Sequence, residues 1–381
     1  MQKNERHIVI RIIIFIFVSI LYLHPTYGME FAATDVETTI LVKKSGRWFG
    51  RATIEKLSNG WFVLCYREAK RHTGSDGVIH IRFSENGGCS WSQEDHHLDG
   101  TPLARFPVSF ESDDAFEPYL YVAPNGRIIL HIWRTNGGNH RKGKGTWQTV
   151  SDDNGKTWSP PQPVDFIGVT NDLHAYATDD HTIVDGVIYT SLREFIGGTQ
   201  LWQCKFIKSA DNGATWQVVS EHINAPEHNS VEKGFEYVGE NRIVSVGSEG
   251  GRKYVFLTHS EDLGRTWAPW EDILPALRVW DRPRIWTLAH LQGRENWWRD
   301  PILIGVGNTT PGRGKKVPRA NTVFISTNRG ASWKIVGGKP IDKFYSDGGY
   351  GDCVYDSQQN KFVYVSYRSA EIVQYRFTLD H

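Results

Sequence analysis

Charged and phenolic side chains recur at corresponding places in successive segments of this chain of 381 residues. Those at the start of the first strand-like run of each segment are Arg51, Glu117, Tyr176, Glu232, Arg282 or Arg284, and Tyr350. Those at the end of the second run are Arg67, Arg134, Arg193, Glu249 and Arg368. Each one alone is most simply a solvated loop residue. If the segments surround one axis, the side chains converge, and such arginines bind a carboxylate through paired hydrogen bonds.

A repeated motif, Ser-x-Asp/Asn-x-Gly-x-Ser/Thr-Trp, shows how these segments are divided. Its five copies begin at Ser84, Ser151, Ser209, Ser260 and Ser326, each after an apolar strand-like run. The Asp or Asn side chain accepts bonds from nearby backbone N–H groups, and the Gly supplies a residue with positive φ. The Trp packs a large apolar ring onto the adjoining sheet. Fixed motifs recurring in this way indicate a repeat architecture in which each repeat is one supersecondary unit.

The fold predicted from these repeats is an all-β, six-bladed propeller of four-stranded antiparallel blades. Five strand groups end at the five motifs, and a sixth follows the last motif. Residues 37–43 form a spare strand that we expect to close the last blade as its outermost strand, which protects the sheet edges. The principal runs expected as strands are 51–57, 61–66, 78–83, 118–122, 128–133, 175–183, 187–192, 235–238, 242–246, 284–289, 302–306, 351–355, 362–367 and 371–377.

The first 28 residues have the features of a secretory signal peptide. Lys3, Arg6 and Arg11 precede a short apolar run, and small residues end at Gly28. The run is too short for a comfortable membrane span, although an uncleaved anchor is the alternative. We therefore expect residues 29–381 to form a single domain, a monomer that is secreted or periplasmic, with no membrane span after cleavage.

The composition limits the partners of the chain. Lys and Arg total 43 and Asp and Glu total 43, so the formal net charge is zero, which argues against bulk nucleic-acid binding. Export permits disulfides, but the cysteines are as readily buried thiols as bridges. No cysteine or histidine group has metal-ligand spacing, so neither a metal nor another cofactor is expected. The four cysteines are Cys65, Cys89, Cys204 and Cys353.

The repeated motif resembles the Asp box of sialidase-like β-propellers, where it joins the third and fourth strands of a blade. Residues 49–54 (Phe-Gly-Arg-Ala-Thr-Ile) are similar to the segment that supplies the first arginine of a carboxylate-binding triad, here Arg51. Arg319 precedes the last motif as the third arginine does. The loop after Arg67 places Asp76 where the family has its acid/base aspartate, although a loop-capping role is the alternative. Residues 347–352 (Asp-Gly-Gly-Tyr-Gly-Asp) are similar to the nucleophile segment, with Tyr350 as nucleophile.

The resemblance implies a secreted exo-glycoside hydrolase that releases sialic acid or a related acidic sugar. A neutral tyrosine avoids the repulsion between a carboxylate nucleophile and the carboxylate on the anomeric carbon, and Glu232 would take its proton, with Glu236 as the alternative in register. Asp76 would protonate the leaving oxygen. The remaining residues predicted to bind the acidic glycan are Arg67, Arg134 and Arg193.

One position departs from the family pattern. Glu249 stands where the second arginine of the triad is expected, and Arg252, Arg193, Arg282 or Arg284 would have to replace it. Two other functions therefore remain open. The first is a propeller polysaccharide lyase or other glycosidase acting on acidic glycans, with His174 and Tyr176 as candidate lyase residues. The second is a propeller that binds glycans without catalysis.

Overall fold

The computed structural model describes residues 31–380, except for residues 73, 75, 137–142, 170–174, 178–179, 197–200, 222–229, 250–254, 274–283, 291–302, 310–318 and 346–347. Within the described strands, only the backbone is considered for residues 195–196, 201–202, 230–233, 248–249, 255, 284–290, 303, 307–309 and 350. The expected signal peptide lies outside the described residues. In the described part of the chain, no helix is long and apolar enough to cross a membrane.

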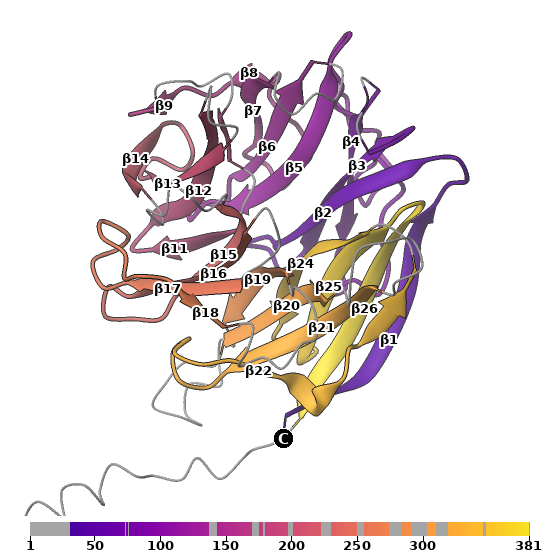
Figure 1. Cartoon of the computed structure of the whole chain (residues 1–381). Helices are drawn as coiled ribbons and strands as arrows, with labels where there is room; N and C mark the ends of the chain where they lie inside the picture. Colours follow the sequence, from indigo (N-terminus) through magenta and orange to yellow (C-terminus); the bar gives the residue numbers. More distant parts are fainter. Residues whose placement is uncertain are drawn as a thin grey trace, which may run out of the picture.

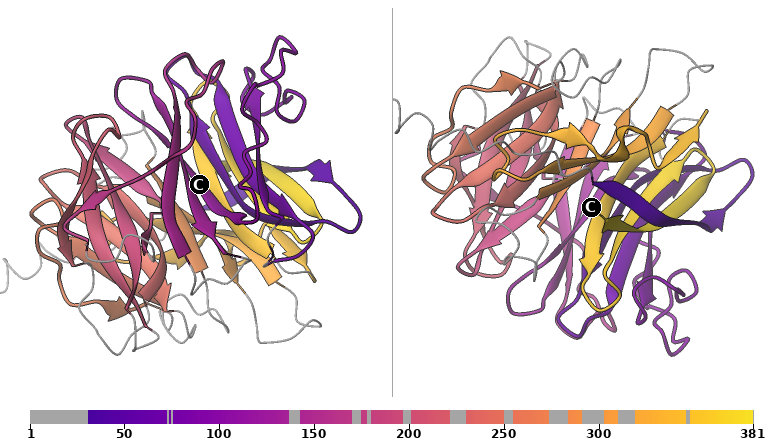
Figure 2. Two further views of the ribbon diagram at one scale, coloured as in Figure 1. Left: turned by 90° about the horizontal axis from the view of Figure 1, so that it is seen from above. Right: turned by 90° about the horizontal axis from the view of Figure 1, so that it is seen from below.

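Six β-sheets form the blades of a propeller, as the sequence predicted (Figures 1 and 2). Blade one contains β2 (Trp48–Lys56), β3 (Phe62–Ala69) and β4 (Val78–Ser84); blade two contains β5 (Asp114–Val122), β6 (Ile128–Thr135), β7 (Gly143–Ser151) and β8 (Gln162–Pro163). Blade three contains β10 (Ala175–Tyr176), β11 (His181–Val184), β12 (Val187–Ile196), β13 (Leu201–Ser209) and β14 (Trp216–Glu221), with β9 (Phe166–Ile167) beside β14.

The second half of the chain forms the other three blades. Blade four contains β15 (Ser230–Tyr237), β16 (Ile243–Glu249), β17 (Val255–Ser260) and β18 (Glu271–Asp272). Blade five contains β19 (Arg284–His290), β20 (Leu303–Thr309), β21 (Arg319–Ser326) and β22 (Lys334–Ile335), followed by a short 3₁₀ turn, η3 (Val336–Gly338), and by β23 (Asp342–Phe344) beside β21. Blade six contains β24 (Gly348–Asp356), β25 (Lys361–Arg368), β26 (Glu371–Asp380) and β1 (Ala32–Lys43).

The closure of the ring by the N-terminal strand is confirmed. The last sheet has the order β1-β26-β25-β24, so β1 is its outermost strand (Figure 1). Val42 pairs with Ile372 and Glu37 pairs with Arg376 in this ladder. Arg376 Nη1 also donates to Glu37 Oε2 over 2.8 Å. The two ends of the described chain are thereby joined, and the edge of β26 is covered.

The strand content of three blades differs from the predicted four: β9 is added to blade three and β23 to blade five, and two further differences have a visible cause. Blade one has three strands rather than four. The segment directly after β4 makes two backbone hydrogen bonds to that strand, from Ser92 N–H to Phe83 O and from Asp95 N–H to Ile81 O, and the chain then turns at Asp95, where φ is 59°. The first strand of blade three is divided into β10 and β11. Asp180 Oδ1 accepts the N–H of His181 there, and this side-chain bond takes the place of a ladder bond.

The five Asp boxes make nearly the same hydrogen bonds. In the second box, Gly155 N–H donates to Ser151 Oγ over 2.8 Å, and Thr157 N–H donates to Asp153 Oδ1 over 2.8 Å. Gly155 has φ 86°, and a Cβ there would lie 2.3 Å from the Phe83 ring of blade one. The glycine is therefore needed both for the turn and for close packing against the preceding blade. The equivalent Ser-to-Gly bonds of the other boxes join Ser84 and Gly88, Ser209 and Gly213, Ser260 and Gly264, and Ser326 and Gly330.

The apolar core lies between neighbouring blades. One cluster combines Ile81 and Phe83 of blade one with Leu130 and Ile132 of blade two, and Trp158 of the second Asp box covers it. Burying each such side chain contributes about 1.5–3 kcal/mol relative to exposure. All four cysteines are free thiols; Cys89 is exposed and the other three are buried.

Candidate functional site

The first strands of five blades contain a β-bulge at one level of the propeller. In four of these blades the second strand ends, or nearly ends, at Arg67, Arg134, Glu249 or Arg368. Each of these residues pairs with a residue of the first strand, and the bulge lies within two residues of that partner. A bulge bends the strand and re-aims the side chain of its extra residue. The candidate residues Arg51, Glu232 and Tyr350 all occupy such positions. The five bulges contain Arg51, Glu117, Glu232, Trp286 and Tyr350.

The backbone around Tyr350 depends on glycine. Gly348 and Gly349 have φ values of 150° and 93°. A Cβ on Gly348 would lie 2.1 Å from Tyr367 O, and one on Gly351 would lie 1.8 Å from Val365 O. The sequence Gly-Gly-Tyr-Gly therefore lets the first strand of blade six bulge while pressed against the second. The side chain of Tyr350 is outside the described residues.

Arg319 is in contact with the backbone near Tyr350. Its Nη1 donates to Gly348 O over 2.8 Å, which joins β21 of blade five to β24 of blade six. The hydroxyl of Tyr364 donates to Gly349 O over 3.1 Å and holds the same bulge from the second strand. Two side chains thus satisfy the carbonyls that the bulge frees from the ladder. The structure brings together Arg319 and the segment of Tyr350, which the sequence placed in neighbouring blades.

Arg51 contacts residues of the neighbouring blade two. Its Nη1 lies 4.0 Å from Glu117 Oε2, and its guanidinium lies over the Tyr119 ring at 5.1 Å from the centroid. Only 9% of the Arg51 side chain is exposed. The bulge residues of blades one and two therefore face each other, and the ring beneath Arg51 fixes the height of its positive charge.

Glu232 lies in the bulge of β15, between Val231 and Lys233, which pair with Ser248 and Gly247. Its side chain lies outside the described residues, as do Arg252, His174 and Arg282. The alternative carboxylate, Glu236, points toward blade three: its Oε1 accepts from Tyr237 N over 3.1 Å and from Thr182 Oγ1 over 3.4 Å. Burial raises the pKa of Glu236 to about 8, so this carboxyl holds its proton near neutral pH.

Asp76 lies in the loop before β4 and caps that loop. Its Oδ2 accepts the N–H of Lys70 over 3.0 Å and lies 3.6 Å from Arg47 Nη1. The side chain is 32% exposed. The loop-capping contact considered as the alternative is therefore present, while the carboxylate remains open to solvent on one side.

Arg67 is taken up by the protein itself. It is 1% exposed, and its Nη2 donates to both carboxylate oxygens of Asp114, over 2.7 and 2.8 Å. Its Nε donates to Ala115 O over 3.0 Å. Burial raises the pKa of Asp114, and the charge of Arg67 opposes that shift. Arg67 thus joins blade one to blade two, and its position gives no support to the predicted contact with substrate.

Arg134 and Arg193 also hold neighbouring groups. Arg134 Nε donates to Asp113 Oδ2 over 2.6 Å, and its guanidinium lies over the Phe110 and Trp147 rings. Arg193 is 3% exposed, and its Nη1 donates to the hydroxyl of Tyr176 over 3.1 Å. The Tyr176 ring is stacked on Trp133 with centroids 4.1 Å apart. These arginines support an aromatic wall, so their predicted part in substrate binding stays a prediction.

A second polar layer, which the sequence reasoning missed, lies further along the first strands. His181 Nδ1 of blade three lies 3.7 Å from Glu55 Oε1 of blade one, which spans the axis between blades that are not neighbours. Tyr119 donates to Asp180 Oδ1 over 2.9 Å, and Ile54 N–H donates to Asp352 Oδ2 over 3.1 Å. At about 3.3 Å per residue, Glu55 lies roughly 13 Å beyond Arg51 along the strand.

The electrostatics of this axial layer suppress charge. Burial, together with the carboxylates of Asp352 and Asp180, holds the pKa of Glu55 well above its usual range. Burial lowers the pKa of His181 to about 4. Both side chains are therefore favoured in their neutral forms. The available sequence signal was a carboxylate four residues after the bulge residue, in Glu55 and again in Glu236.

The structure has six blades, and five of them carry an Asp box on the turn after the third strand. These two features define the class of Asp-box β-propellers. Residues 60–284 match the family model described as the BNR repeat-like domain, and the chain belongs to that family. No curated protein sequence matches the chain.

Several solved structures share the fold. A protein of unknown function from Dyadobacter fermentans DSM 18053 superposes with a TM-score of 0.67 at 14% identity, over 93% of this chain and 100% of that one. Hadza microbial sialidase Hz136 gives a TM-score of 0.65 at 16% identity, over 87% of this chain and 65% of the sialidase. Trypanosoma rangeli sialidase, in complex with the inhibitor DANA, gives 0.61 at 13% identity, over 90% of this chain and 60% of the enzyme. At these identities the likeness shows the shared fold.

Proposed function

We propose that this chain is a secreted, sialidase-like exo-glycosidase that removes a terminal acidic sugar, sialic acid or a relative, from a glycan. The observation that supports the proposal is that the backbone positions of Arg51, Glu232 and Tyr350 all lie in bulges of first strands, and that Arg319 donates to Gly348 O beside Tyr350. The apolar N-terminal run before Gly28 supports secretion.

The reaction would proceed by two displacements. The Tyr350 oxygen attacks the anomeric carbon as the glycosidic C–O bond breaks, and Glu232 takes the phenolic proton. Asp76 gives its proton to the leaving oxygen. Water then attacks the anomeric carbon of the tyrosyl intermediate, Asp76 takes a proton from this water, and Glu232 returns its proton to Tyr350. Each positioned proton transfer typically contributes about 10²–10⁴ in rate.

The sugar carboxylate would be held by Arg51 and Arg319. A guanidinium presents paired donors that match a carboxylate, and both arginines are already oriented by the protein. Arg319 is fixed by Gly348 O, and Arg51 by the Tyr119 ring and Glu117. This pre-organisation lowers the entropy lost on binding.

The experiment is hydrolysis of an aryl α-sialoside by the wild-type chain and by Tyr350→Phe. We expect turnover by the wild type and a loss of more than about 100-fold in the variant. Tyr345→Phe is the matched control, because Tyr345 is 69% exposed, five residues away, and its loss should leave the rate unchanged. Absence of turnover by the wild type, or equal rates for wild type and Tyr350→Phe, would refute the proposal.

A second candidate is a propeller that binds acidic glycans without cleaving them. Glu249, at the end of β16, favours it, because a carboxylate at that place repels the sugar carboxylate. Tight binding of a sialylated glycan together with no turnover of any acidic glycoside would establish this function instead.

A further inference from the structure

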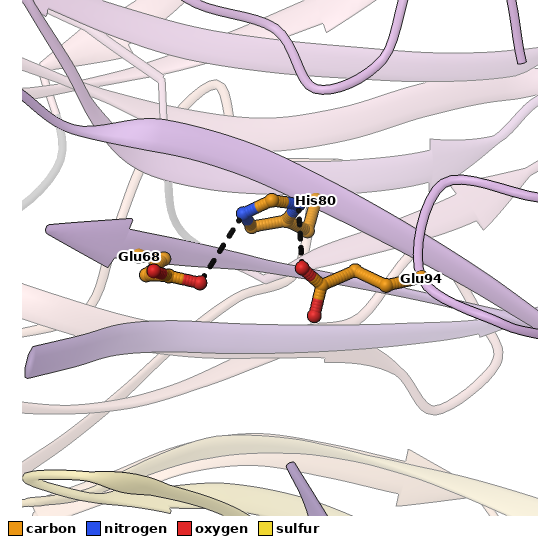
Figure 3. A group of neighbouring side chains, drawn as sticks. All are labelled: Glu68, His80 and Glu94. Atoms are coloured by element: carbon orange, nitrogen blue, oxygen red, sulfur yellow. Dashed lines mark ion pairs between the residues drawn. The ribbon is translucent and has the colours of Figure 1, made fainter. Parts of the chain in front are cut away.

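A compact group of possible metal ligands lies in blade one (Figure 3). Glu68 is on β3, His80 is on β4, and Glu94 follows the first Asp box. One ligand atom from each of the three residues lies within 4.8 Å of the others. Glu68 and His80 are buried, and the Glu94 side chain is 22% exposed.

His80 is held in an orientation that suits a metal ligand. Its Nδ1 lies 2.7 Å from Asp95 Oδ2 and 3.2 Å from Glu94 Oε1, and because a carboxylate accepts, an N–H at Nδ1 donates to the nearer oxygen, that of Asp95. Such a bond orients the ring and leaves Nε2 facing Glu68, as the outer carboxylate does in carboxylate–histidine–metal sites. The His80 side chain is only 8% exposed, and its Nε2 has no hydrogen-bond partner.

The surroundings of Nε2 call for a cation. The Nε2 atom lies 3.4 Å from Glu68 Oε2, and a dashed line in Figure 3 marks this pair. A lone pair facing a carboxylate oxygen is repulsive unless a positive charge lies between them. That charge is either a proton on the imidazole or a metal ion. The two carboxylates of the group carry a charge that a divalent ion would neutralise.

Lys44 already occupies the position of a cation in this group. Its Nζ lies 2.6 Å from Glu68 Oε2 and 2.7 Å from Glu94 Oε1, so one ammonium bridges the same two carboxylates. Lys44 lies directly after β1 on the way to β2, and 39% of its side chain is exposed. The long lysine side chain can therefore turn outward into water and leave this position to a metal ion.

The remaining carboxylate oxygens are held from outside the group. Arg47 Nε donates to Glu68 Oε1 over 2.6 Å, and the hydroxyl of Tyr66 donates to Glu94 Oε2 over 2.7 Å. With Asp95 on His80, each of the three ligands has an orienting partner. Metal sites typically have such outer partners.

We propose that Glu68, His80 and Glu94 form a site for a divalent transition-metal ion, represented by zinc, and that the ion displaces the ammonium of Lys44. One imidazole and two carboxylates suit zinc and the other imidazole-binding metals better than calcium or magnesium. None of the three ligands belongs to the predicted sialidase site, although Arg47, which orients Glu68, also lies 3.6 Å from Asp76 Oδ2.

Titration calorimetry with zinc chloride tests the site on the whole purified chain after treatment with a chelator. We expect one zinc ion per chain in the wild type. Lys44→Met removes the competing ammonium and should tighten binding by at least about tenfold, whereas His80→Ala should weaken it by at least about tenfold. His259→Ala is the control, because His259 lies 3.6 Å from Glu261 on an exposed surface and should not change the affinity.

Two outcomes would overturn the proposal. One is the absence of saturable zinc binding in both wild type and Lys44→Met. Nitrogen NMR that shows both ring nitrogens of His80 protonated would then identify the cation as a proton. The other is zinc binding that survives His80→Ala unchanged. Lys44→Met keeps the test valid if His80→Ala fails to fold, because it retains all three ligands.

Discussion

The outer Asp boxes and the inner bulges both recur around the propeller, but they recur in different ways. The boxes repeat residue types as well as positions. A Ser hydroxyl accepts the Gly N–H in all five boxes, and the Asp or Asn side chain accepts an N–H of the Ser or Thr two residues after the Gly. The bulges repeat only the position, and the residues at these positions are Arg51, Glu117, Glu232, Trp286 and Tyr350.

This difference distinguishes positions that maintain the fold from positions that could form a binding or catalytic site. A position that needs the same residue in every blade meets the same local demand, such as the positive φ and close packing of Gly155. A position that is geometrically equivalent but chemically different in every blade is free to build an asymmetric site at the centre of a symmetric frame. Changes in the boxes should therefore affect stability, and changes in the bulges should affect binding and rate.

The largest expected effect on stability is at Arg67, a charged residue near the mouth that we assign to the scaffold. Arg67→Met should lower the free energy of unfolding by about 3–5 kcal/mol, because it leaves the buried carboxylate of Asp114 without its partner. Denaturant unfolding measures this change. Arg127→Met is the control, because its partner Asp152 is 59% exposed, and it should cost less than about 1 kcal/mol. Equal effects of the two substitutions would contradict the assignment.

A smaller loss of stability is expected in the second Asp box. Gly155→Ala should cost about 2–4 kcal/mol, because the new Cβ meets the Phe83 ring at 2.3 Å and φ is 86°. Gly60→Ala has the same φ and no atom within 4 Å of its Cβ, so it should cost only about 1 kcal/mol. The difference between the two midpoints of unfolding isolates packing between blades. If the two variants unfold alike, the box glycine serves only the turn.

The fold was largely predictable because its signals are local. Each Asp box lies within eight residues, so the boxes gave the blade boundaries, and residues 37–43 gave the closing strand. The burial of Arg67 was not predictable, because its partner Asp114 lies 47 residues away in a stretch that reads as a polar loop. The contact of Glu55 with His181 forms only when blades one and three face each other across the closed ring.

The pH dependence of stability should reflect the ionisation of Glu236, which lies on the first strand of blade four. Its folded pKa of about 8 exceeds the ordinary value of 4.5, so the folded chain holds a proton that the unfolded chain releases. The resulting contribution is fully present below pH 4.5 and is lost as the pH rises to about 8. The difference in stability between wild type and Glu236→Gln, measured by thermal unfolding as a function of pH, should show this slope.

Glu240→Gln serves as the control for that slope, because the Glu240 side chain is 83% exposed. Its stability should follow the wild-type pH profile. A wild-type profile that is parallel to that of Glu236→Gln between pH 4.5 and 8 would show that Glu236 is ionised in the folded chain.

The smallest expected effect is a lower KM, produced by a substitution in blade four near its bulge. Glu249→Arg places a guanidinium at the end of β16, where the resemblance to sialidases predicts one. It should lower KM for an aryl α-sialoside about 3–10-fold, with little change in stability, because a charge-assisted bond to the sugar carboxylate replaces a repulsion. Glu261→Arg, on the exposed box of the same blade, is the control. An unchanged or higher KM for Glu249→Arg would show that this position does not face the sugar.

The most direct test of the distinction between bulges and boxes is kcat/KM for aryl α-sialoside hydrolysis by Tyr350→Phe and Gly155→Ala, measured at a temperature at which both variants are folded. We predict that Tyr350→Phe loses more than about 100-fold, while Gly155→Ala, though less stable, keeps its rate within a few-fold of wild type. A full rate for Tyr350→Phe, or a comparable loss in both variants, would contradict the account.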